Sequence, residues 1–116
     1  MRILTLATTA LLTLAADAAY AHAFLDHAEP RVGSTAPAAP KEVVLSFTQN
    51  LEPAFSSVEV SDANGARVDL GKPKISASTM RVGVKPLPPG TYRVRWQVLS
   101  VDTHTTEGNF TFQVGQ

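Results

Sequence analysis

The sequence contains no cysteine, only two methionines and one tryptophan, and its formal charges sum to zero. Without thiols the chain forms neither a disulfide framework nor a zinc–thiolate or iron–sulfur centre. Ten basic and ten acidic side chains leave no excess charge that would draw the whole chain to nucleic acid or to an anionic membrane. A length of 116 residues allows one domain, which excludes a large multidomain enzyme.

The longest apolar run lies at the amino end of the chain. A short positive start precedes small and apolar residues from Ile3 to Ala16, and Ala19-Tyr20-Ala21 places small side chains where a signal peptidase inspects the chain. This run is too short for a retained membrane span, which needs about 20 apolar residues. We therefore predict that residues 1–21 are a signal peptide, cleaved after Ala21, and that residues 22–116 are exported to the periplasm without membrane insertion.

The mature chain alternates apolar and polar residues with a period of two, and no segment has helical periodicity. The clearest strand has four large side chains on one face: Tyr92, Val94, Trp96 and Val98. We expect Trp96 to belong to the core. Asn64-Gly65 is a strong hairpin signal, and it predicts that Val68 and Leu70 lie on a returning strand. About seven short strands separated by turn residues predict an all-β, antiparallel Greek-key sandwich or barrel.

Cleavage after Ala21 would leave a histidine as the first residue, which has chemical consequences. His22 would then have a free α-amine and an imidazole that close one chelate ring on a single metal ion. Such an amine has an ordinary pKa near 8, so it loses its proton far more easily than a lysine.

A second pair of candidate ligands lies near the carboxyl end, where Asp102 and His104 are two residues apart. In extended backbone their side chains leave the same face about 7 Å apart at Cα, in phase with Trp96. Together with His22 they offer three nitrogens and one oxygen, a set that suits one tetragonal Cu(II) ion, although Zn(II) accepts the same donors. Cu(I) prefers soft ligands, and Met80 alternates with core valines. We predict a Cu(II) site formed by His22, Asp102 and His104.

Two alternative functions stay open at this point. An amino-terminal histidine is also found in the histidine-brace site of copper monooxygenases, and a metal-free sandwich could act as an interaction module. Other enzyme templates find little support, because the sequence contains no nucleophile elbow, P-loop or dinucleotide fingerprint. His27 is interpreted as a surface histidine.

Several segments resemble the CopC family of periplasmic copper-resistance proteins. These segments are residues 22–25 (HAFL), 29–34 (EPRVGS), 44–51 (VLSFTQNL), 90–96 (GTYRVRW) and 100–104 (SVDTH). The resemblance implies a cupredoxin-like or immunoglobulin-like fold that binds copper in the periplasm, and its ligands carry over to His22, Asp102 and His104. It also implies a CopD-type inner-membrane partner.

Two departures from the family pattern concern the metal. Some members have a glutamate near the copper where this sequence has Gln49, and some have a Cu(I) loop with methionines and a histidine, which residues 60–75 lack. The missing loop favours Cu(II) over Cu(I) as the bound ion. We expect the protein to be a monomeric Cu(II) carrier or buffer, and not an enzyme.

Overall fold

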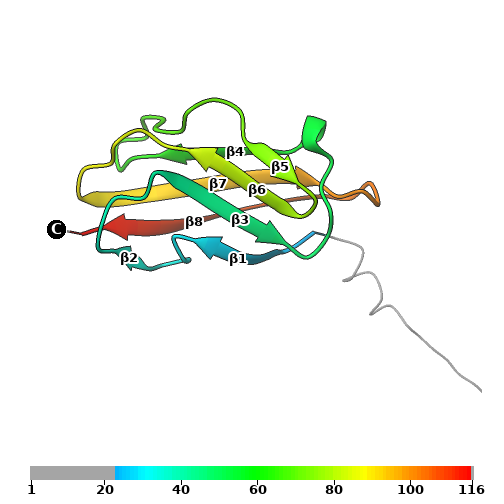
Figure 1. Cartoon of the computed structure of the whole chain (residues 1–116), viewed down its shortest axis with the longest axis horizontal. Coiled ribbons are helices and arrows are strands. Elements are labelled where there is room, and N and C mark those ends of the chain that lie inside the picture. Colours follow the sequence, from blue (N-terminus) through cyan, green and yellow to red (C-terminus); the bar gives the residue numbers. More distant parts are fainter. Residues whose placement is uncertain (1–22, 116) are drawn as a thin grey trace, which may run out of the picture.

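Two four-stranded β-sheets face each other in the computed structural model, which describes residues 23–115 (Figure 1). The predicted signal peptide and His22 lie outside the described residues. The first sheet has the order β1 (Leu25–Glu29), β3 (Glu42–Phe47), β6 (Thr79–Gly83), β5 (Lys74–Ser76). The second has the order β2 (Thr35–Ala36), β8 (Thr105–Val114), β7 (Gly90–Leu99), β4 (Ser57–Ser61).

The predicted all-β antiparallel sandwich is confirmed. About seven strands were predicted and the described residues form eight, among them the two-residue strand β2, which pairs with β8 in parallel. The remaining strand pairs are antiparallel. Within the described residues, a 3₁₀ turn, η2 (Pro53–Phe55), lies between β3 and β4. Among residues 23–115, no helix is both long and apolar enough to cross a bilayer.

The core lies between the two sheets, where alternate residues of each strand point inward. The first sheet contributes Val43, Leu45, Phe47, Met80 and Val82, and the second contributes Val58, Val60, Tyr92, Val94, Trp96, Val98, Phe110, Phe112 and Val114. Phe47 and Trp96 meet edge to face across the two layers, with ring centroids 5.1 Å apart and an interplanar angle of 75°. Trp96 is therefore a core residue, as predicted.

The indole of Trp96 depends on a glycine in the neighbouring strand. Gly108 pairs with Trp96, and a Cβ placed on Gly108 would lie 2.6 Å from Trp96 Cζ2. A Cβ on Gly83 of β6 would meet Leu70 Cδ1 at 3.7 Å, an ordinary contact. Of these two glycines, only Gly108 leaves no room for a methyl group.

Replacing Gly108 with alanine will lower the stability of the fold. The added methyl group must displace a buried ring, and such overpacking costs about 1 to 3 kcal/mol. In a domain of this size, each kcal/mol lowers Tm by about 4 to 8 °C. Calorimetry should find this loss for Gly108→Ala and no loss for the matched control Gly83→Ala. Equal Tm values for the two variants would contradict the packing argument.

The hairpin that follows β4 differs from the prediction. Gly65 turns the chain with φ +87°, as its sequence signal indicates, but Val68 and Leu70 do not form a returning strand. Only single bridges join Ser61 to Arg67 and Asp69 to Val84, and Leu70 is 55% exposed. The physical reason is that the side chain of Asp69, and not a backbone carbonyl, accepts the hydrogen bond from the Val60 amide of β4, while the Leu70 amide donates to the Gly83 carbonyl of β6.

Candidate metal site

Asp102 and His104 lie in the tight turn between β7 and β8. His104 Nδ1 is 3.4 Å from Asp102 Oδ1, so the structure brings the two predicted side chains together. The predicted extended backbone is wrong, because β7 ends at Leu99 and Thr103 has φ +73°. The turn is closed by the Ser100 amide, which donates to the His104 carbonyl at 3.0 Å. The pair therefore meets across a turn and not along one face of a strand.

Ser100 holds this turn from inside the protein. It is fully buried, and its hydroxyl donates a hydrogen bond to Asp102 Oδ1. The next amide, that of Val101, donates to the carbonyl of Asn50 at 3.0 Å, which ties the turn to the segment after β3. Ser100 was absent from the sequence-based candidates. The sequence did contain an indication of its role. Ser100 follows the core residue Val98 by two positions, so its side chain also points inward, and a buried hydroxyl needs a hydrogen-bond partner.

The environment of Asp102 favours its charged form. The hydroxyl of Ser100, followed by the imidazole of His104, lowers the pKa of Asp102 below the ordinary aspartate value. A hydrogen bond donated to a carboxylate stabilises the ionised state. Asp102 is therefore a deprotonated oxygen donor at neutral pH.

Removing the Ser100 hydroxyl will raise the pKa of Asp102 toward its ordinary value. Since the folded pKa is depressed, Asp102 contributes stability above the unfolded pKa and loses it as pH falls through the folded one. Ser100→Ala shifts that loss to higher pH. Carboxyl ¹³C NMR of the metal-free protein measures the change. Ser56→Ala is the control, because it also removes a serine hydroxyl, but one that donates to the Glu52 carbonyl and not to Asp102. An unchanged titration of Asp102 in Ser100→Ala would contradict this role.

The first described residue is fixed beside the same turn. The carbonyl of Ala23, which is fully buried, accepts a hydrogen bond of 2.6 Å from Thr106 Oγ1. The next residue, Phe24, exchanges two hydrogen bonds of 2.9 Å with Thr48. Thr106 is two residues beyond His104, so the chain just after His22 is anchored next to the Asp102–His104 pair (right-hand end in Figure 1). Neither threonine was among the sequence-based candidates.

The other residues considered in the sequence have distinct surroundings. His27 is exposed on β1, with Nε2 3.7 Å from Glu29 Oε2, which agrees with its interpretation as a surface histidine. Met80 is fully buried in the core, as predicted. Gln49 is half-buried in the bend after β3. Residues 23–115 contain no group of three or more His, Asp or Glu side chains close enough together to hold a metal ion.

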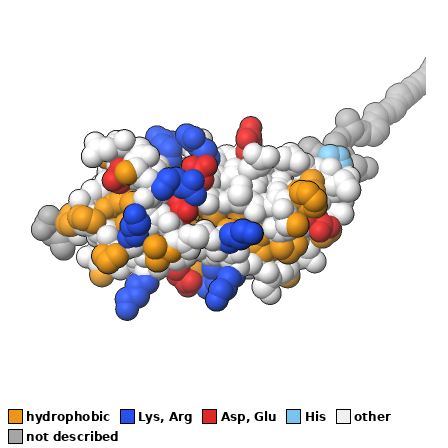
Figure 2. Space-filling model, turned by 90° about the horizontal axis from the view of Figure 1, so that it is seen from above, with side chains coloured by type: hydrophobic (Ala, Val, Ile, Leu, Met, Phe, Trp, Pro, Cys, Tyr) orange, Lys and Arg blue, Asp and Glu red, His pale blue; other side chains and the backbone are white. Residues whose placement is uncertain are grey.

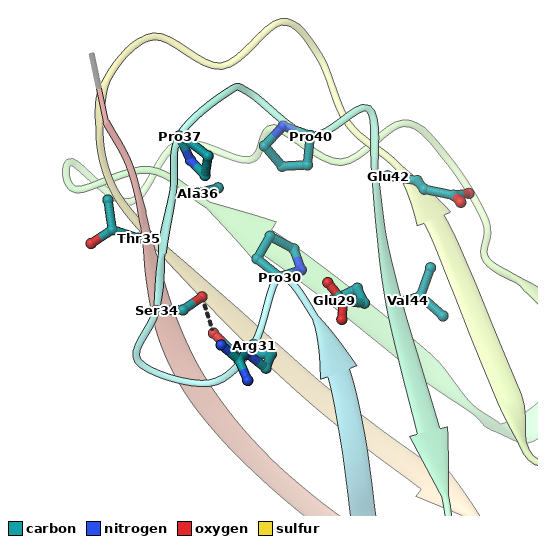
Figure 3. Close-up of a pocket in the computed structure, with 10 residues that line it drawn as sticks. All are labelled: Glu29, Pro30, Arg31, Ser34, Thr35, Ala36, Pro37, Pro40, Glu42 and Val44. Atoms are coloured by element: carbon teal, nitrogen blue, oxygen red, sulfur yellow. Dashed lines mark hydrogen bonds between the residues drawn. The ribbon is translucent and has the colours of Figure 1, made fainter.

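A pocket lies toward the other end of the sandwich, where β3 begins (Figure 3). It has a volume of about 480 Å³, and its lining contains two carboxylates, Glu29 and Glu42, but no histidine. In the loop that forms one wall, Ser34 Oγ donates a hydrogen bond to the Arg31 carbonyl. This pocket does not include the Asp102–His104 pair, which lies on an open turn.

The fold and the carboxylate–imidazole pair define a small β-sandwich protein of the cupredoxin-like class with a candidate metal site at one end. The CopC domain model matches residues 25–115, so the chain belongs to the CopC family. The family resemblance found in the sequence is therefore confirmed.

Known relatives cover most of the chain. Protein YobA of Escherichia coli K12 is 33% identical over 96% of this chain and 90% of its own length. Copper resistance protein C of Escherichia coli is 35% identical, over 85% and 86% of the two chains.

Solved structures of two similar proteins have the same fold. CopC of Methylosinus trichosporium OB3b has a TM-score of 0.76 at 34% identity, covering 81% of this chain and 94% of that one. PcoC, described as a methionine-rich copper resistance protein of Escherichia coli, has a TM-score of 0.72 at 34% identity, covering 80% and 98%.

Proposed function

We propose that this protein binds one Cu(II) ion per chain through His22, Asp102 and His104 and acts as a periplasmic copper carrier or buffer. The observation that supports this most is the hydrogen bond from Thr106 to the carbonyl of Ala23. It holds the residue that follows His22 close to the Asp102–His104 pair. Adjacent Cα atoms are 3.8 Å apart, so only a short distance would separate the amine and imidazole of His22 from Asp102 and His104.

The donor set favours a divalent ion. The amine, two imidazoles and one carboxylate make three nitrogens and one oxygen, and Cu(II) binds such a set more tightly than the other first-row divalent ions do. Asp102 contributes its oxygen without losing a proton, because its pKa is already lowered. Two donors on His22 also reduce the entropy that binding costs.

Cu(I) lacks suitable ligands in the described part of the chain. The sulfur of Met80 lies in the fully buried core, and no cysteine exists. In this respect the chain differs from PcoC, which is described as methionine rich. The proposed cargo is therefore Cu(II).

The proposed role is carriage of the ion and not catalysis. Export by the signal peptide 1–21 would place the mature protein in the periplasm as a monomer, where it would sequester copper or pass it to a CopD-type membrane protein. The named relatives support a copper role, since one of them is called copper resistance protein C.

Titration of the chain 22–116 with Cu(II), followed by paramagnetic resonance, tests the proposal. One equivalent should saturate a single tetragonal signal with nitrogen hyperfine structure at pH 7. Because amines and imidazoles bind metals only when unprotonated, the signal should decline as pH falls through about 6 to 5. Absence of a saturable site, or a signal from oxygen ligands alone, would refute the proposed ligand set. Ascorbate-driven peroxide production would favour the histidine-brace enzyme instead.

A further inference from the structure

One end of the sandwich exposes large apolar side chains around the candidate metal site. We call it the site end, and it comprises residues 23–26, 48–56, 77–79 and 98–107. Backbone hydrogen bonds join these segments, among them Leu51 N–H to the Ala77 carbonyl and Glu52 N–H to the Leu99 carbonyl. Three of its side chains are conspicuously exposed: Phe24 at 46%, Phe55 at 69% and Val101 at 50%.

Exposed aliphatic side chains also occur elsewhere, at Val32 and Leu70, but the exposed phenylalanines are confined to the site end. The other three phenylalanines are buried in the core: Phe47, Phe110 and Phe112. Both exposed phenylalanines therefore lie at the site end, one in the segment before β1 and one in η2. Aromatic side chains that stay in contact with water around a functional site are typical of the centre of a protein–protein interface.

Charged side chains are also distributed unequally between the site end and the rest of the molecule. The site end contains four acidic residues and no lysine or arginine: Asp26, Glu52, Asp102 and Glu107. The sequence has ten basic residues, and all except Arg2 lie in the rest of the described chain, where nine basic residues face five acidic ones. On the face seen in Figure 2, Lys and Arg side chains are scattered over the body of the molecule, and none lies at the right-hand end, where hydrophobic, acidic and histidine side chains are seen.

We propose that the site end is the docking surface for a copper-exchanging partner protein, whose own surface has an apolar centre and a rim of lysine and arginine. This inference rests on the proposed function for the exchange of copper. Phe24, Phe55 and Val101 supply the apolar contact, while Glu52 and Glu107 supply the complementary charge. A Cu(II) ion would offset only two of the four negative charges, so the loaded form keeps its attraction for a basic surface.

The charge pattern also decides against two other occupants. A two-fold dimer through the site end would set each patch against its own copy, with acidic residues opposite acidic residues. An anionic lipid surface would repel the same residues. A basic partner satisfies both the apolar and the acidic parts of the surface.

Site-specific photocrosslinking in cells that produce the full chain tests the inference. A p-benzoylphenylalanine residue replaces Phe24, Phe55 or Val101 in turn, and Val32 or Leu70 in the matched controls, which are 59% and 55% exposed elsewhere. We expect at least fivefold more adduct with one other protein at the site-end positions. The double variant Glu52→Lys, Glu107→Lys should lower that adduct at least fivefold, while Glu29→Lys, Glu59→Lys, which adds the same charge elsewhere, should not.

The captured protein, once purified, should also speed the loss of the Cu(II) resonance from the loaded wild-type chain. The inference would be overturned by equal adducts at all five positions, by adducts with only a second copy or with lipid, or by no adduct. It would also be overturned if the charge reversal did not change the adduct, or if the captured protein had no effect on copper release. Copper binding by the wild-type chain is measured separately. A chain that binds Cu(II) but forms no site-specific adduct refutes the docking surface alone, and one that forms the adduct but binds no Cu(II) refutes the proposed function.

Discussion

Blocking the amine of His22 will weaken Cu(II) binding at least about a hundredfold, which corresponds to about 2.7 kcal/mol. The block removes one nitrogen donor and opens the chelate ring that the amine and imidazole of His22 would close. Among residues 23–115, no further His, Asp or Glu side chain groups with Asp102 and His104 to offer a replacement donor.

A glutamine added before His22 gives a clean test, because it cyclises to pyroglutamate and leaves no basic amine. Competition titrations with a chelator of known affinity would compare this chain with the one that begins at His22. Enzymatic removal of the pyroglutamate supplies the control, since it should restore full affinity in the same protein sample. Equal affinities before and after removal would refute the amino-terminal ligand.

Replacing His104 with alanine will also weaken Cu(II) binding about a hundredfold or more. The substitution removes the imidazole that lies 3.4 Å from Asp102. His104 is about half exposed on a turn, so the variant should keep its fold and its Tm. Loss of affinity can then be assigned to the missing nitrogen and not to unfolding.

His27→Ala is the matched control for this substitution. His27 is similarly exposed, but it lies on β1 beside Glu29 and outside the site end. Its removal should change the affinity less than twofold and leave the nitrogen hyperfine pattern intact. The ligand assignment would be wrong if the two variants lost copper equally, or if only His27→Ala lost it.

Much of the architecture could be predicted because the core alternates so regularly along the strands. Inward positions such as Val94, Trp96 and Val98 follow directly from a period of two, and burial of apolar area makes that pattern decisive. The returning strand after Asn64-Gly65 could not be predicted in this way. There the side chain of Asp69 takes the hydrogen bond of the Val60 amide, and the Leu70 amide pairs with the Gly83 carbonyl of β6.

The sequence by itself determined the all-β class, the core face of each long strand, the absence of thiol ligands and the pairing of Asp102 with His104 as candidate ligands. The tertiary structure alone decided how that pair meets. Thr103, with its left-handed backbone conformation, and the buried hydroxyl of Ser100 close a turn there, and local sequence propensities predict neither feature. It also brought Ala23 against Thr106, 83 positions along the chain. Such contacts form because two sheets must cover each other's apolar faces, and that packing depends on the whole chain at once.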